Sequence, residues 1–119
     1  MRPLPAVAAL LLLLAAPPTF GHALLRTADP PVGSTVAAAP KELKLTFSEA
    51  VEPAFTRVEV TGAHGENEAA GSLHADTADA RRVILPLKTL APGDYTVTWH
   101  AVSVDTHRTE GRFRFTVAR

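Results

Sequence analysis

The chain of 119 residues contains no cysteine, and its single methionine is Met1. Without cysteine there can be no disulfide bridge, no thiolate nucleophile and no thiolate metal ligand. Any bound metal ion would therefore be held by nitrogen and oxygen atoms. Soft ions favour thiolate and thioether sulfur, so nitrogen and oxygen ligands bind them weakly. The sequence thus leaves room only for hard or borderline metal ions.

The chain also lacks an excess of either charge. It has 12 Lys and Arg against 12 Asp and Glu, and losing Arg2 with an N-terminal leader would leave 11 against 12. Proteins that bind nucleic acids or acidic membranes through electrostatics usually carry a basic excess. We therefore expect no nucleic-acid partner.

Only one long apolar run is present, and it is too short to span a membrane. It covers 11 residues, Ala6–Ala16, follows Arg2 and ends in the helix-breaking segment "PPTFG". A spanning helix needs roughly 17–25 apolar residues. A positive residue, a short apolar core and small residues at positions −3 and −1, here Thr19 and Gly21, are typical of a secretory signal peptide.

This pattern predicts that residues 1–21 are a cleaved signal peptide. Cleavage would leave residues 22–119 as one mature domain, which is long enough to form its own core. The first residue of that domain would be His22. An uncleaved anchor is the alternative interpretation, and the absence of cysteine argues against a lipoprotein.

The mature part alternates apolar and polar residues between turn signals rich in proline and glycine. Period-two alternation predicts antiparallel strands with one buried face each. Six or seven short strands in such a chain predict an all-β fold, an immunoglobulin-like or Greek-key β-sandwich. Residues 62–80 break the pattern and are expected to form an irregular connection with at most one short strand. The alternating segments are residues 42–48, 55–62 (with Phe55, Val58 and Val60 inward), 81–87, 94–102 and 111–118.

Three of the five histidines have an ordinary structural interpretation. His64 and His74 fall in the irregular stretch and are expected to be solvated loop residues. His100 is out of phase with the inward-facing Trp99 and its apolar neighbours, so it should point toward solvent.

Asp105 and His107 form a different pattern. They lie two residues apart, so in an extended segment both side chains point to the same side. A carboxylate and an imidazole that converge in this way can bind a borderline ion such as copper(II) or zinc. They can equally make an ordinary hydrogen bond, and the pair alone does not decide between the two.

His22 would gain a second nitrogen donor if it became the first residue of the chain. A terminal histidine offers its α-amino nitrogen and its ring Nδ1 to the same ion, once both have lost their protons. Together with His107 this gives three nitrogens, to which Asp105 can add an oxygen. Copper(II) prefers square-planar nitrogen and oxygen ligation. The alternative is that His22 is simply the residue at which the mature chain starts.

Three segments of the sequence resemble the CopC family of periplasmic copper-binding proteins. They are "HALLRTADPPVGSTV", "PKELKLTFSEAVEPAF" and "LAPGDYTVTWHAVSVDTHRTEGRFRFTV", in this order and with comparable spacing. The resemblance covers essentially the whole mature chain. It implies a small cupredoxin-like or immunoglobulin-like β-sandwich or barrel of about seven strands.

The resemblance also implies a metal site. It assigns one copper(II) ion per mature chain to His22 (amine and ring), Asp105 and His107, with Glu49 of "FSE" as a weak ligand or near neighbour. It places Trp99 in the core, close enough to report on the metal. Some members of the family hold copper(I) in a methionine-rich loop, but residues 62–80 contain no methionine. The chain therefore resembles the members that have only a copper(II) site.

The function implied is that of a periplasmic, monomeric copper(II) carrier for resistance, homeostasis or delivery, and not of an enzyme. A separate inner-membrane protein of the CopD type is the implied partner. Two alternatives come from other classes of protein. One is a copper-dependent oxidative enzyme, because some such enzymes also use a histidine chelate. The other is a metal-free immunoglobulin-like interaction module.

Overall fold

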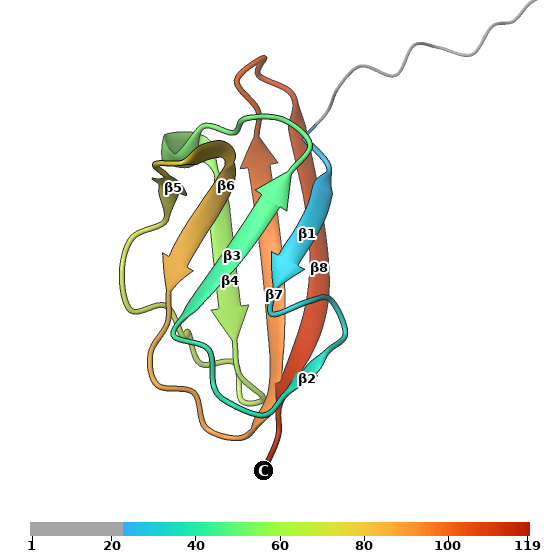
Figure 1. The fold of residues 1–119 in the computed structure, drawn as a ribbon, viewed down its shortest axis with the longest axis vertical. Helices are drawn as coiled ribbons and strands as arrows, with labels where there is room; N and C mark the ends of the chain where they lie inside the picture. The colour runs from blue at the N-terminus through green and yellow to red at the C-terminus, as the bar shows by residue number, and fades with distance from the viewer. Residues whose placement is uncertain (1–22) are drawn as a thin grey trace, which may run out of the picture.

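The computed structural model describes residues 23–119, which form two β-sheets packed face to face (Figure 1). The first sheet has the strand order β1-β3-β6-β5 and the second β2-β8-β7-β4. All neighbours pair antiparallel except β2, which runs parallel to β8. The strands are β1 (Leu25–Asp29), β2 (Thr35–Val36), β3 (Glu42–Phe47), β4 (Arg57–Thr61), β5 (His74–Asp76), β6 (Asp79–Pro86), β7 (Gly93–Val102) and β8 (Arg108–Val117).

The predicted all-β sandwich is confirmed, with eight strands among the described residues instead of about seven. The number of strands is higher than expected because the structure includes two very short strands. β2 has two residues and β5 has three. β5 is the one short strand expected within residues 62–80, so His74 lies in a strand and not in a loop as the sequence predicts.

The core forms between the sheets, where the alternating apolar residues meet. Leu43, Leu45 and Phe47 of β3 are buried, and Val97 and Trp99 of β7 face them from the other sheet. The rings of Phe47 and Trp99 pack edge to face with centroids 5.3 Å apart. Such aromatic contacts add to the burial of apolar surface that holds the two sheets together.

The indole of Trp99 also explains a glycine in the middle of β8. Gly111 is the register partner of Trp99 on the neighbouring strand. A Cβ atom at position 111 would lie only 2.5 Å from Cζ2 of the indole. Only a residue without a side chain leaves room for this ring, so Gly111 helps to place it in the core.

The expectation that Phe55 faces the core is wrong. Phe55 ends the 3-10 turn η1 (Pro53–Phe55), and 71% of its surface is exposed. The turn interrupts the strand pattern, so that buried alternation begins only at Val58 in β4. Among residues 23–119, η1 is the only helical segment. This part of the chain contains no helix long and apolar enough to cross a membrane.

Candidate metal centre

The loop between β7 and β8 brings Asp105 and His107 into contact. The backbone N–H of Thr106 donates to the carbonyl of Ser103 (2.9 Å), and that of Ser103 donates to the carbonyl of His107 (3.0 Å). Thr106 has φ 71°, in the left-handed region. In this turn His107 Nδ1 lies 3.1 Å from Asp105 Oδ2. The two side chains meet, but through a turn rather than along the extended segment that the sequence predicts.

Hydrogen bonds keep the Asp105 carboxyl ionised. The buried hydroxyl of Ser103 donates to Oδ1, and the ring and backbone N–H of His107 contact the same carboxylate. These contacts lower the pKa of Asp105 to about 2, the Ser103 hydrogen bond contributing most. Donors that bond to the charged form favour it. Asp105 is therefore an anionic oxygen donor at any pH near neutral.

The spacing of the two donor atoms suits adjacent positions on one metal ion. Ligands bound at roughly 2.0–2.1 Å and at right angles to each other lie about 2.9 Å apart. The observed separation between His107 Nδ1 and Asp105 Oδ2 is 3.1 Å. Both side chains are about half exposed, at 46% and 44%, so an ion can reach them from solvent. A metal ion bound there would replace the direct contact between the two side chains.

The beginning of the described chain is held beside this loop. Ala23 is fully buried, and its carbonyl accepts a 2.7 Å hydrogen bond from the hydroxyl of Thr109. Leu24 and Ser48 then bond to each other twice. The N–H of Leu24 donates to Ser48 Oγ (2.9 Å), and the N–H of Ser48 donates to the Leu24 carbonyl (2.8 Å). The chain is thereby fixed between the end of β3 and the start of β8.

Thr109 lies two residues after His107, so Ala23 is anchored close to the Asp105 loop. In Figure 1, β1 begins at the same end of the sandwich as the β7–β8 loop. The expected ligand His22 and the expected signal peptide, residues 1–21, lie outside the described residues. What the structure does describe is the anchor of the residue that follows His22.

Glu49 lies on the segment that runs along this loop. It is half-buried and directly follows Ser48. The next residue, Ala50, accepts a 3.1 Å hydrogen bond from the N–H of Val104 in the loop. Yet within residues 23–119 no three His, Asp or Glu side chains are grouped closely enough to hold a metal ion. Glu49 therefore does not complete a three-residue site with Asp105 and His107.

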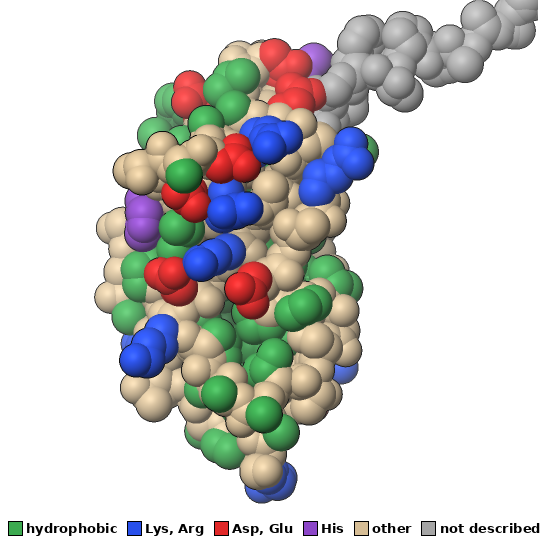
Figure 2. All heavy atoms as spheres, in the orientation of Figure 1, with side chains coloured by type: hydrophobic (Ala, Val, Ile, Leu, Met, Phe, Trp, Pro, Cys, Tyr) green, Lys and Arg blue, Asp and Glu red, His purple; other side chains and the backbone are tan. Residues whose placement is uncertain are grey.

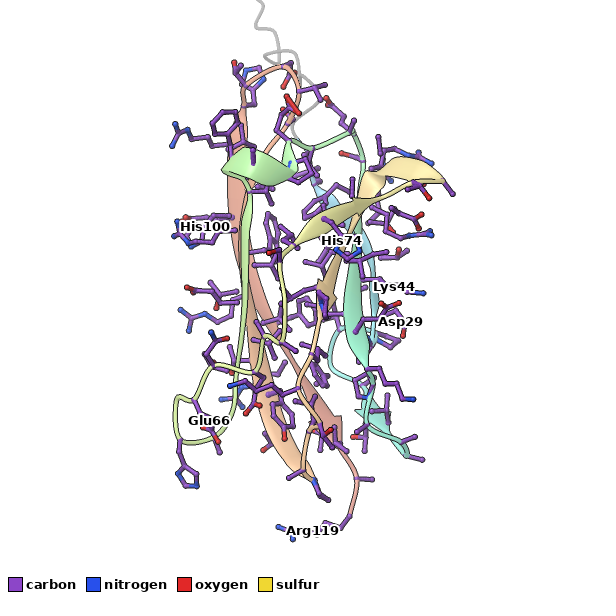
Figure 3. All side chains as sticks on the ribbon, turned by 90° about the vertical axis from the view of Figure 1, so that its left-hand side faces the viewer. Asp29, Lys44, Glu66, His74, His100 and Arg119 are labelled. Atoms are coloured by element: carbon purple, nitrogen blue, oxygen red, sulfur yellow. The ribbon has the colours of Figure 1, made fainter. Side chains whose placement is uncertain are left out.

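The remaining histidines lie apart from this site. His100 points away from the interior on the outer face of the second sheet (Figure 3), where its Nδ1 is 3.1 Å from Glu110 Oε1. This agrees with the predicted solvent-facing position. His74 lies in β5 of the other sheet, and its ring Nδ1 is 3.1 Å from the carbonyl of Ser72. The backbone N–H of His64 bonds to Glu66, which Figure 3 places at the opposite end of the sandwich.

Three hydroxyl residues of this region were not found by sequence reasoning. Ser103 precedes Asp105 by two residues, and this spacing in a turn is a local signal that could have identified it. Ser48 and Thr109 had no such signal, because their partners are 24 and 86 residues away along the chain. Only the packing of β1, β3 and β8 reveals them.

Comparisons with known proteins identify the family to which this fold belongs. The CopC domain family matches residues 25–118. Protein YobA of Escherichia coli K12 is 40% identical over 113 residues, which cover 94% of this chain and 91% of that protein.

Two solved structures share the fold. CopC from Methylosinus trichosporium OB3b matches with a TM-score of 0.75 and 33% identity, over 82% of this chain and 94% of that one. PcoC, a methionine-rich copper resistance protein from Escherichia coli, matches with a TM-score of 0.70 and 31% identity, over 82% and 99%. With a family match over nearly all described residues and relatives of this identity, the chain belongs to the CopC family.

Proposed function

We propose that this chain is a periplasmic copper(II)-binding protein that serves copper resistance, homeostasis or delivery. One copper(II) ion is bound by the amine and ring of His22 together with Asp105 and His107. Glu49, on the segment beside the loop, is a neighbour of this site. The observation that carries this proposal is the 3.1 Å contact between an ionised Asp105 and His107, beside the anchored start of the chain.

The ligand set suits copper(II) better than copper(I). Imidazole and amine nitrogens with a carboxylate oxygen favour copper(II), whereas copper(I) favours sulfur, which this chain lacks after Met1. The related PcoC is a methionine-rich copper resistance protein. A role that depends on holding copper(I) is therefore not part of the proposal.

The anchor at Ala23 supports the assignment of His22 as a ligand. His22 is bonded to Ala23, so the two Cα atoms are about 3.8 Å apart. Fixing Ala23 and Leu24 by three hydrogen bonds restricts the volume that the amine and ring of His22 can sample. Less freedom is then lost when the metal binds, which raises affinity.

Export and metal binding are linked in this proposal. Before cleavage, the backbone nitrogen of His22 is part of an amide and cannot act as an amine ligand. Removing residues 1–21 creates the donor, so a complete site exists only in the exported protein. The mature protein acts as a monomer and exchanges copper with a separate membrane protein of the CopD type.

Copper(II) titration of the mature protein tests the proposal directly. Trp99 is the only tryptophan and lies on β7, the strand that leads into the metal loop. We expect copper(II) to quench the fluorescence of Trp99 with an end point at one equivalent. We also expect the protein to retain its copper when a nitrogen chelator competes for the ion. Loss of all copper to the chelator would instead support a metal-free interaction module. Turnover of ascorbate and peroxide by the loaded protein would support an oxidative enzyme.

The Thr109 anchor gives a second prediction. Thr109→Val keeps the side-chain shape but removes the donor to the Ala23 carbonyl. We expect roughly tenfold weaker copper(II) binding, similar to the loss of other groups that orient metal ligands. The electron paramagnetic resonance spectrum should change too, and Thr109→Ser should restore both. Thr116→Val is the matched control, because it removes a 2.8 Å bond to Asp94 at the other end of β8. Equal weakening by the control would contradict the anchoring role.

A further inference from the structure

The two outer faces of the sandwich differ in how their charges are paired. On the first sheet, basic side chains lie beside acidic ones, and Figure 2 shows the two kinds interspersed over this face. The ion pairs there are Lys44–Glu42 at 3.6 Å, Arg81–Asp79 at 3.1 Å and Arg82–Asp76 at 3.3 Å. This face therefore neutralises its own charge.

Among residues 23–119, the outer face of the second sheet leaves several of its charged side chains unpaired. Arg57 on β4 and Arg108 and Arg112 on β8 point outward from it. Within the described part of the chain, none of the three forms an ion pair. Two acidic side chains lie among them. Glu110 contacts His100, at 3.1 Å, and Glu59, two residues after Arg57 on β4, points outward without forming an ion pair in the described part of the chain. With Arg114, further along β8, four guanidinium groups on this face are thus left without a carboxylate partner among the described residues.

Three of these arginines line a groove. Arg57, His100 and Glu110 stand side by side in the strand register, with Arg57 and Arg108 on opposite sides of β7. The hollow has a volume of about 510 Å³, with the exposed ring of Phe55 in its wall. A second hollow of about 330 Å³ shares His100 and Glu110 and extends to Arg112. The two neighbouring hollows on the outside of β7 thus bring three arginines, Glu110 and the apolar ring of Phe55 to one surface, which we call the groove.

The groove lies next to the candidate metal centre. Val102 and Arg108 are both part of its lining. They are also the last residue of β7 and the first of β8, so they flank the loop that carries Asp105 and His107. In Figure 3, η1 lies above His100 on this face, toward the end that carries the loop. A molecule seated in the groove would therefore sit beside the bound metal.

We propose that this groove binds a carboxylate-rich, extended segment of a protein that exchanges copper with this chain. The partner's role rests on the proposed function, but the binding chemistry does not. Arginine forks bind carboxylates through paired hydrogen bonds, and an apolar residue of the segment packs on Phe55. Charge complementarity of this kind speeds the encounter and sets orientation. A hollow of this kind fits an extended peptide better than the flat surface of a membrane.

The test uses a fluorescein-labelled peptide of six glutamates and one phenylalanine, with a glutamine version as the neutral control. Binding is followed by fluorescence anisotropy on the mature protein. The groove variant combines Arg57→Gln, Arg108→Gln and Arg112→Gln. The matched control, Lys41→Gln with Arg81→Gln and Lys88→Gln, removes the same charge elsewhere. We expect binding to weaken at least about tenfold in the groove variant, to change little in the control, and to fall with added salt.

Three results would overturn the proposal. These are no binding of the acidic peptide, equal loss in both variants, or stronger binding to phosphatidylglycerol vesicles than to the peptide, which would assign the face to a membrane. Copper(II) titration of both variants is run in parallel. We expect the copper affinity of the groove variant not to fall, because the three arginines are not metal ligands and their positive charge disfavours a cation. If the wild-type protein bound no copper, the proposed function would fail while the peptide result still stood.

Discussion

One glycine added in front of His22 is expected to weaken copper(II) binding by at least about 100-fold, since even groups that only orient a ligand contribute about 10–100-fold. The extension keeps every side chain of the mature domain. It converts the α-amine of His22 into an amide, which is no longer a basic donor, and moves the new amine one residue away. A chelate that depends on amine and ring from the same residue is lost.

The comparison needs three proteins that differ only at their ends. They are the mature chain starting at His22, the same chain with the extra N-terminal glycine, and a control with one glycine after Arg119. Intact mass verifies each start point, and competition with a nitrogen chelator gives each affinity. Thermal unfolding without metal should be the same in all three. Equal copper affinity of the first two would eliminate the terminal chelate while leaving the fold assignment unaffected.

The sandwich could be predicted from the sequence because its strands follow local rules. Alternation in β3, β7 and β8 reports which side chains are buried, and turn residues mark the ends. Phe55 shows the limit of this reasoning. Its apolar side chain fits the alternation, but Pro53 begins a 3-10 turn that shifts the pattern and leaves the ring exposed. Hydrophobicity alone does not reveal where a strand begins.

The candidate metal centre could be predicted only in part from the sequence, for a similar reason. Asp105 and His107 are close in sequence, so their convergence could be predicted. The turn that joins them, with Thr106 in the left-handed region, could not. The anchor of Ala23 depends on Thr109, which is 86 residues away along the chain. Contacts of that kind arise when β1 pairs with β3 and the sheets close, so no local pattern records them.

The hairpin of β7 and β8 carries two imidazole–carboxylate pairs with the same separation. His107 and Asp105 are 3.1 Å apart, and so are His100 and Glu110. The two histidines are similarly exposed, at 46% and 41%. They differ in their surroundings. The first pair lies close to the anchored Ala23, and the second lies among the arginines of the groove, whose positive charge disfavours a cation.

His107→Ala is therefore expected to weaken copper(II) binding by roughly 100-fold, and His100→Ala to leave it nearly unchanged. Removing His107 takes away one of three nitrogen ligands, while His100 contributes none. Chelator competition measures the affinities, and electron paramagnetic resonance should show fewer coordinated nitrogens only in His107→Ala. Both side chains are exposed, so the two variants should unfold at similar urea concentrations. If His100→Ala caused the larger loss, the metal would have to be assigned to the groove on the outer face instead of the loop.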